Sequence, residues 1–76
     1  MKNTNYAPEM ASAMKWIINH SYDGDLHWFL TQLRETVGDP DYTHSDRWSW
    51  TYDWMKEHYP EVTGSIITGI VYAMEE

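Results

Sequence analysis

Tryptophan and acidic side chains are interspersed in the segment 48–59, and they are the residues best suited to bind a partner. At about 100° of rotation per residue of an α-helix, Trp50 and Trp54 lie on one face, beside Asp53 and Glu57. Tryptophan is a frequent anchor of protein–protein interfaces, and carboxylates around an anchor steer basic partners toward it. The pattern therefore predicts a partner-binding patch of these four residues.

The other face of the same segment is also large and aromatic, which leaves two further interpretations open. That face carries Trp48, Tyr52, Met55 and Tyr59. If the segment is the central helix of the fold, both faces are packed and Trp50 and Trp54 belong to the core. In a third interpretation, Arg47 stacks on Trp50 and shields it from solvent.

The stretch 35–46 contains four acids, namely Glu35, Asp39, Asp41 and Asp46, and no Lys or Arg. Carboxylates in fixed positions can imitate a phosphate backbone, so Asp39, Asp41 and Asp46 are predicted to extend the partner-binding surface. With His44 they also resemble hard-metal ligands, but the Gly and the distal Glu of a calcium loop are absent. The simplest alternative places Asp39 and Asp41 around a Pro turn and Asp46 at a helix N-terminus. We predict no bound metal.

No residue pattern in the chain is typical of catalysis. There is no Cys, the four His residues form no His-Glu-x-x-His pair, and no Ser lies in a nucleophile elbow. The segments around Gly64 and Gly69 lack the Lys of a phosphate-binding loop. The sequence therefore predicts neither catalytic residues nor a cofactor, and we expect a protein that is not an enzyme.

The bulk composition gives two opposing indications about folding. Leu, Ile, Val and Phe make up only 12 of the 76 residues, and 12 acidic against 5 basic residues give a charge of −7. Such values are typical of disorder. The 5 Trp, 6 Tyr and 5 Met residues favour a packed core instead, because disordered chains are poor in aromatic residues. We expect one folded domain over residues 1–76, with residues 1–7 as a loose N-terminal segment.

Apolar spacing predicts two helices in the first half of the chain. The first covers about residues 8–20, with Pro8 in its first turn. The second begins with Asp25 as its N-cap and continues to Val37. Gly38 follows at the position where a helix commonly ends in the left-handed conformation.

A third helix is expected to start near Thr43 or Ser45, with Thr43 and Asp46 spaced like a capping box, and to end before Pro60. Alternating aromatic residues there also fit a strand, but the segment continues with helix-favouring residues. The fourth segment, 61–74, has a helical apolar stripe, although its two Gly and many β-branched residues leave a strand open. The fold class predicted is all-α: a small single domain of about four short helices around one aromatic and Met-rich core.

The net charge limits the classes of partner. A charge of −7 disfavours direct binding to nucleic acid and to anionic membranes. We expect a cytoplasmic protein with neither a signal peptide nor a membrane-spanning segment.

The first hypothesis for the function is a binding module that inhibits or modulates a larger basic protein that handles nucleic acid. In size and charge the chain is similar to phage and mobile-element anti-CRISPR and anti-restriction proteins. The alternatives are a homo-oligomeric accessory subunit, such as a homodimer, and a small metal-dependent enzyme.

Overall fold

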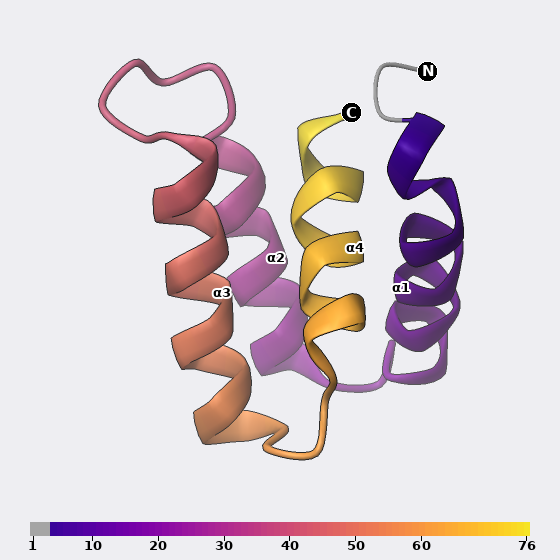
Figure 1. Ribbon diagram of the computed structural model, residues 1–76. Coiled ribbons are helices and arrows are strands. Elements are labelled where there is room, and N and C mark those ends of the chain that lie inside the picture. The colour runs from indigo at the N-terminus through magenta and orange to yellow at the C-terminus, as the bar shows by residue number, and fades with distance from the viewer. Residues whose placement is uncertain (1–3) are drawn as a thin grey trace.

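The computed structural model describes residues 4–76, and all regular secondary structure in this part of the chain is helical. A short 3₁₀ helix, Thr4–Tyr6, precedes four α-helices. These are α1 (Ala7–Asn19), α2 (Gly24–Glu35), α3 (His44–His58) and α4 (Gly64–Glu75). Successive helices run in opposite directions, so the α2–α3 loop and the C-terminus lie at one end of the bundle (Figure 1). The prediction of an all-α domain of four short helices is confirmed. Of the predicted loose segment, residues 1–3 lie outside the described residues.

Helix α4 is the centre of the bundle. It lies between α1 and α3 with α2 behind it, and it packs against all three, most extensively against α1 (Figure 1). Its Ile67, Ile70 and Val71 are buried, so its apolar residues face several neighbours at once. The strand alternative for this segment is wrong. The helix also starts later than expected, at Gly64, because the Thr63 hydroxyl caps it by accepting a hydrogen bond from the Ile66 N–H at 3.3 Å.

The contact between α1 and α4 depends on Gly69. A Cβ atom at this position would lie 2.6 Å from the carbonyl carbon of Glu9 and 2.8 Å from the Cβ of Ala13. Both distances are shorter than side chains tolerate, and one of the two atoms belongs to rigid helix backbone. Gly69 therefore allows the two helix backbones to approach, and its cost in helix propensity is offset by this packing.

The fully packed centre of the fold is mainly aliphatic, and aromatic rings surround it. The buried cluster contains Ala13, Leu26, Phe29, Leu33, Met55, Val62, Ile67 and Ile70. Half-buried Trp16, Trp48, Trp54 and Tyr59 pack against this cluster. The chain thus places most of its aliphatic residues where the helices meet, and it places its aromatic residues other than Phe29 toward the edges, where part of a ring meets solvent.

Helix α2 begins earlier than expected. Its N-cap is Asp23, whose carboxylate accepts hydrogen bonds from the N–H groups of Asp25 and Leu26 at 2.9 and 3.4 Å. The prediction of Asp25 as the cap is wrong, because Asp25 already lies in the first helical turn. At the other end α2 stops at Glu35, two residues before the predicted Val37, but Gly38 has the predicted left-handed conformation, with φ +90°.

Asp23 also connects the two loops at the end of the bundle opposite the α2–α3 loop. The Tyr59 hydroxyl donates a hydrogen bond to its carboxylate, and this bond is the main reason why the pKa of Asp23 falls below its ordinary value of 3.8. Burial, together with the same bond, raises the pKa of Tyr59 above its ordinary 10.0. The Tyr59 ring packs edge-on against Trp16 and His20, with ring centroids 5.0 and 5.2 Å apart.

The Tyr59–Asp23 bond predicts a specific pH dependence of stability. A lowered carboxyl pKa means that the stabilisation is present above pH 3.8 and is lost as the pH falls through the folded-state pKa. A raised phenol pKa means that it is present below pH 10.0 and is lost as the pH rises further. Tyr59→Phe should therefore lower the melting temperature at pH 7, and the difference from the wild type should shrink at both extremes.

The matched control for this measurement is Tyr22→Phe, which removes the hydroxyl of a nearby tyrosine that is 81% exposed. Melting curves followed by circular dichroism from pH 3 to pH 11 should show no such difference for this variant. Equal effects of the two substitutions at pH 7 would contradict the stabilising role of the bond.

Candidate partner-binding groove

Helix α3 is packed along a line that differs from the predicted one. Thr51 and Met55 are fully buried, whereas Tyr52 is 38% exposed and stacks on Trp48. The Thr51 hydroxyl donates to the Arg47 carbonyl at 2.7 Å, so this buried polar group is satisfied within the helix. The buried line lies between the two faces that the sequence separated, and aromatic residues on both sides of it therefore contact neighbouring helices.

Phe29 of α2 determines how the two candidate anchor tryptophans lie. Trp54 stacks on Phe29 with ring centroids 4.5 Å apart and also stacks on His58 at 4.0 Å. Trp50 meets Phe29 edge-on at 4.8 Å and keeps 37% of its surface exposed. Trp54 thus belongs to the packed edge of the core, and Trp50 is the more accessible of the two rings.

The loop between α2 and α3 is built from local hydrogen bonds. The Asp39 N–H donates to the Thr36 carbonyl, and the Asp39 carboxylate accepts from the Asp41 N–H at 2.9 Å. The predicted capping box then starts α3 and is confirmed. The Asp46 N–H donates to the Thr43 hydroxyl at 3.1 Å, and the Thr43 N–H donates to the Asp46 carboxylate at 2.9 Å. These bonds fix the path of residues 36–46.

Arg47 holds this loop closed from the side of α3. Its guanidinium donates to the carbonyls of Thr36 and Tyr42, at opposite ends of the loop, at 3.1 and 3.2 Å. Its Nε donates to the Glu75 carboxylate at 2.8 Å. The same carboxylate also contacts His44 Nδ1 at 2.9 Å. The interpretation in which Arg47 stacks on Trp50 is wrong, because the loop carbonyls and Glu75 take its hydrogen bonds.

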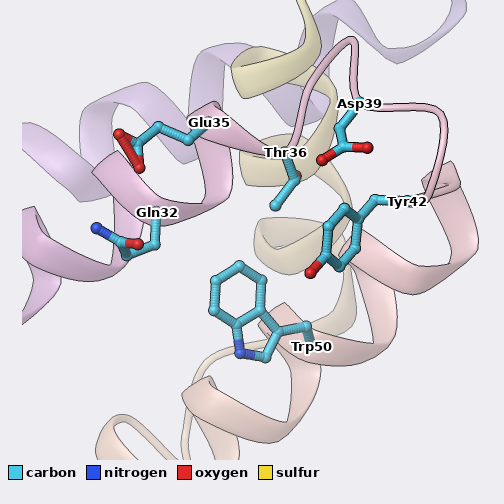
Figure 2. Close-up of a pocket in the computed structure, with 6 residues that line it drawn as sticks. All are labelled: Gln32, Glu35, Thr36, Asp39, Tyr42 and Trp50. Carbon is cyan, nitrogen blue, oxygen red and sulfur yellow. The ribbon is translucent and has the colours of Figure 1, made fainter.

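A hollow of about 540 Å³ opens beside this loop, and its lining combines aromatic and acidic side chains. We call it the loop groove, lined by Gln32, Glu35, Thr36, Asp39, Tyr42 and Trp50. Figure 2 shows Gln32 and Glu35 coming from α2 on one side and Tyr42 and Trp50 on the other, with Asp39 extending from the loop. Tyr42 is 49% exposed. The groove thus has aromatic rings on one wall and carboxylates at its rim.

A second hollow of about 380 Å³ adjoins the loop groove, since Tyr42 and Trp50 line both. Its remaining lining consists of Asp41, Asp46, Arg47 and Ser49. Because they share Tyr42 and Trp50, the two hollows lie side by side on a surface that runs from the last turn of α2 to the first turns of α3. Four of the predicted partner-binding residues line this surface: Asp39, Asp41, Asp46 and Trp50.

The charges of this surface are mostly unbalanced. Within residues 4–76, the ion pairs are those of Glu75 with Arg47 and His44, so Glu35, Asp39 and Asp41 form none. Hydrogen bonds from the backbone and the hydroxyl of Thr43 lower the pKa of Asp46 below its ordinary 3.8. Asp46 is therefore ionised at neutral pH. The surface carries a local excess of negative charge that a basic group can neutralise.

The other predicted site residues lie apart from the loop groove. Asp53 and Glu57 are exposed on α3, one and two turns beyond Trp50, and Trp54 is packed on Phe29. The alternative metal site does not form in the part of the chain that the structure describes. No group of three or more His, Asp or Glu side chains there is arranged to hold a metal ion, and His44 faces Glu75.

Gln32, Glu35, Thr36 and Tyr42 line the groove but are absent from the predicted site. A signal for Tyr42 exists in the sequence, since it is an aromatic residue between Asp41 and the helix cap Thr43 in a turn-rich, acidic stretch. Nothing local marks Gln32 or Thr36, because they join the groove only when Arg47 closes the loop onto α2.

Comparison with known proteins does not extend the description of the site. No protein-family model matches the chain, and neither a curated protein nor a solved structure matches it at a significant level. The class of protein established by the fold is a small acidic four-helix domain. None of its described helices combines the length and the apolar character that crossing a membrane requires.

Proposed function

We propose that this protein is a binding module that inhibits or modulates a larger basic protein by occupying a basic surface on it. The observation that carries the proposal is the pair of accessible rings, Tyr42 and Trp50, set in a groove whose acids lack ion-pair partners within residues 4–76. Partly exposed aromatic rings provide binding energy at interfaces, and unpaired carboxylates around them attract a positively charged partner.

The partner we propose is a protein that handles nucleic acid. Such proteins carry Lys and Arg surfaces arranged to neutralise phosphates. Four carboxylates along the two adjoining hollows, together with a net charge of −7, can occupy a surface of this kind in place of the nucleic acid. This is the mode of action expected of anti-CRISPR or anti-restriction inhibitors from phage or mobile elements. The proposed location is the cytoplasm, which is that of the host cell if a phage encodes the protein.

The experiment that tests this function compares two charge variants of the tagged protein in capture from a cell lysate. Glu35→Gln with Asp39→Asn removes two groove charges, and the introduced amide keeps an oxygen that can accept the Asp41 N–H. Asp25→Asn with Glu61→Gln removes two exposed charges outside the groove. We expect the wild type to capture a basic protein that elutes as the salt concentration rises and that its own nucleic acid displaces. This protein should bind the groove variant about tenfold more weakly than the wild type.

Two results would refute the proposal. One is a captured protein whose binding ignores salt and nucleic acid. The other is equal weakening by both double variants, which would show that the overall charge and not the groove attracts the partner.

A second candidate function is a homo-oligomeric accessory subunit. The observation that favours it is an exposed apolar strip on α1, where Met14 and Ile18 are 42% and 66% exposed. Large apolar side chains at helical spacing on an outer face suit an interface between copies. Sedimentation equilibrium decides the matter: a dimer that Ile18→Lys dissociates supports this function, and a monomer at all concentrations contradicts it.

A further inference from the structure

We propose that the loop groove receives an arginine side chain of the partner, with the guanidinium against Trp50, its N–H groups directed to Asp39, and the negative charge of Glu35 at the rim. This inference rests on the proposed function and specifies the chemistry that the groove recognises. It follows from the aromatic wall, from the placement of the carboxylates, from the position of the protein's own cations and from the rigidity of the site.

The aromatic wall favours a flat cation. Trp50 and Tyr42 present ring surfaces that are 37% and 49% exposed within one hollow. A cation over an aromatic face is attracted by the negative π-surface, most strongly over Trp. The planar guanidinium of arginine stacks on such a ring while keeping its N–H groups free, whereas the ammonium of lysine is compact and strongly hydrated. The wall therefore favours arginine over lysine.

The carboxylates that line the groove come from two separate elements. Glu35 comes from the last turn of α2 and Asp39 from the loop (Figure 2). The Asp39 carboxylate lies beside Tyr42, whereas the Glu35 carboxylate is directed away from both rings (Figure 2). Asp39 is therefore the acceptor for the guanidinium N–H groups, and Glu35 adds negative charge at the rim. Glu35 has no ion-pair partner among the described residues, and Asp39 uses one oxygen to accept the Asp41 N–H. Acceptor oxygens are therefore free for a ligand.

The positions of the protein's own cations distinguish the loop groove from the second hollow. Arg47 lines the second hollow, and its positive charge disfavours another cation there. Among the described residues, no Lys or Arg lines the loop groove. Elsewhere in the chain, Lys56 lies over the Tyr52 ring at 5.3 Å, so this protein already pairs a cation with an exposed ring on α3. Within residues 4–76, the ring of Trp50 has no such cation.

The groove is held in shape before a ligand arrives. Phe29 meets the Trp50 ring edge-on, and Arg47 ties both ends of the loop to α3. A site that needs little ordering on binding loses less conformational entropy and binds more tightly. The open mouth of the hollow admits a side chain that projects from the surface of a larger protein.

The test uses the whole protein and three capped nine-residue peptides of Gly and Ser that carry three arginines, three lysines or three citrullines at the same positions. Citrulline keeps the shape of arginine without its charge. Isothermal titration at low salt should give the strongest binding for arginine, binding about threefold weaker for lysine, and none for citrulline. Equal affinities for arginine and lysine would overturn the inference, as would binding of citrulline.

Protein variants locate the binding. Trp50→Ala should weaken the arginine peptide about tenfold, and Trp50→Phe should restore part of the affinity because it keeps an aromatic face. Trp28→Ala removes a tryptophan that is 59% exposed and is absent from the groove lining, so it should leave the affinity within about twofold of the wild type. Equal losses for Trp50→Ala and Trp28→Ala would also overturn the inference. The peptide comparison on the wild type gives its answer even if Trp50→Ala fails to fold.

This inference and the proposed function can fail separately. If a basic partner is captured in a salt- and groove-dependent way but the peptides are not distinguished, the function stands and the arginine site is wrong. If the arginine peptide binds at Trp50 but no nucleic-acid-handling protein is captured, the arginine site stands and the function is wrong.

Discussion

Replacing Gly69 by Ala should destabilise the protein by about 3 kcal/mol, although Ala is the better helix former. In an unpacked helix the substitution would gain up to about 1 kcal/mol. Here the new Cβ meets the backbone of Glu9 and the side chain of Ala13, and separating α1 from α4 opens the most extensive helix contact of the fold. For a chain of 76 residues, whose stability is roughly 4–11 kcal/mol, the loss is a large share of the total.

Gly64→Ala is the matched control for this prediction. A Cβ atom at position 64, the first residue of α4, meets nothing within 4 Å. This substitution should leave the stability unchanged or raise it by up to about 1 kcal/mol. Urea unfolding followed by circular dichroism measures both variants. If Gly69→Ala proved as stable as Gly64→Ala, the close contact between α1 and α4 would not exist in the protein.

Phe29→Ala should cost about 3–5 kcal/mol of stability, the other large effect expected of a single substitution. Phe29 is fully buried, stacks on Trp54 and supports the edge of Trp50. Its removal leaves a cavity between α2 and α3 and frees both tryptophan rings. Stability is again measured by urea unfolding, and near-ultraviolet circular dichroism reports how rigidly the tryptophans are held.

Phe29→Leu separates the two consequences, because it keeps most of the volume and should cost only about 1.5 kcal/mol. The folded variant should still lose part of the tryptophan signal and bind the arginine peptide more weakly, since Trp50 has lost its aromatic support. The control for the stability measurement is Ile18→Ala, which truncates an exposed residue and should change the free energy of unfolding by no more than about 0.5 kcal/mol. Unchanged peptide affinity in Phe29→Leu would show that the support of Trp50 by Phe29 does not matter for the groove.

The features of the fold that could be predicted are those encoded by local chemistry. The capping box of Thr43 and Asp46 and the left-handed Gly38 depend on residues close in sequence, and both are present in the structure. The sequence does not distinguish Asp25 from Asp23 as the cap of α2, because the two side chains are chemically alike. The true cap is Asp23, which the Tyr59 hydroxyl, 36 residues away, also contacts. The spacing of apolar residues along the chain does not reveal the contact between Tyr59 and Asp23.

The arrangement around α4 depends on contacts between distant parts of the chain. In the sequence, Gly69 argues against a helix because glycine has a low helix propensity. What stabilises the helix there is close packing against the backbone of α1, which lies far away along the chain. The packing of α3 is hard to predict for a similar reason. Thr51 is polar, and a polar residue is commonly exposed. Its hydroxyl donates a hydrogen bond to the Arg47 carbonyl of the same helix, and this bond allows Thr51 to be fully buried.

The candidate site could be predicted in part. Trp50 and three acids, Asp39, Asp41 and Asp46, are identified by residue type, and the structure places them along the two adjoining hollows. Glu35 also lines the groove but is not among the predicted site residues. The assembly of the groove depends on Arg47, whose hydrogen bonds to the loop carbonyls close the loop. A side chain that bonds to carbonyl oxygens leaves no pattern in the sequence, so the contribution of α2 to the groove could not be foreseen.

The central claim is that the loop groove binds an arginine of a basic partner, and nuclear magnetic resonance of the ¹⁵N-labelled protein tests it most directly. On titration with the arginine peptide, the indole N–H of Trp50 and the amides of Glu35, Asp39 and Tyr42 should shift together along one saturable curve. The indole N–H of Trp28, outside the groove, should not move. Shifts spread evenly over all exposed acids, or confined to α1, would contradict the claim.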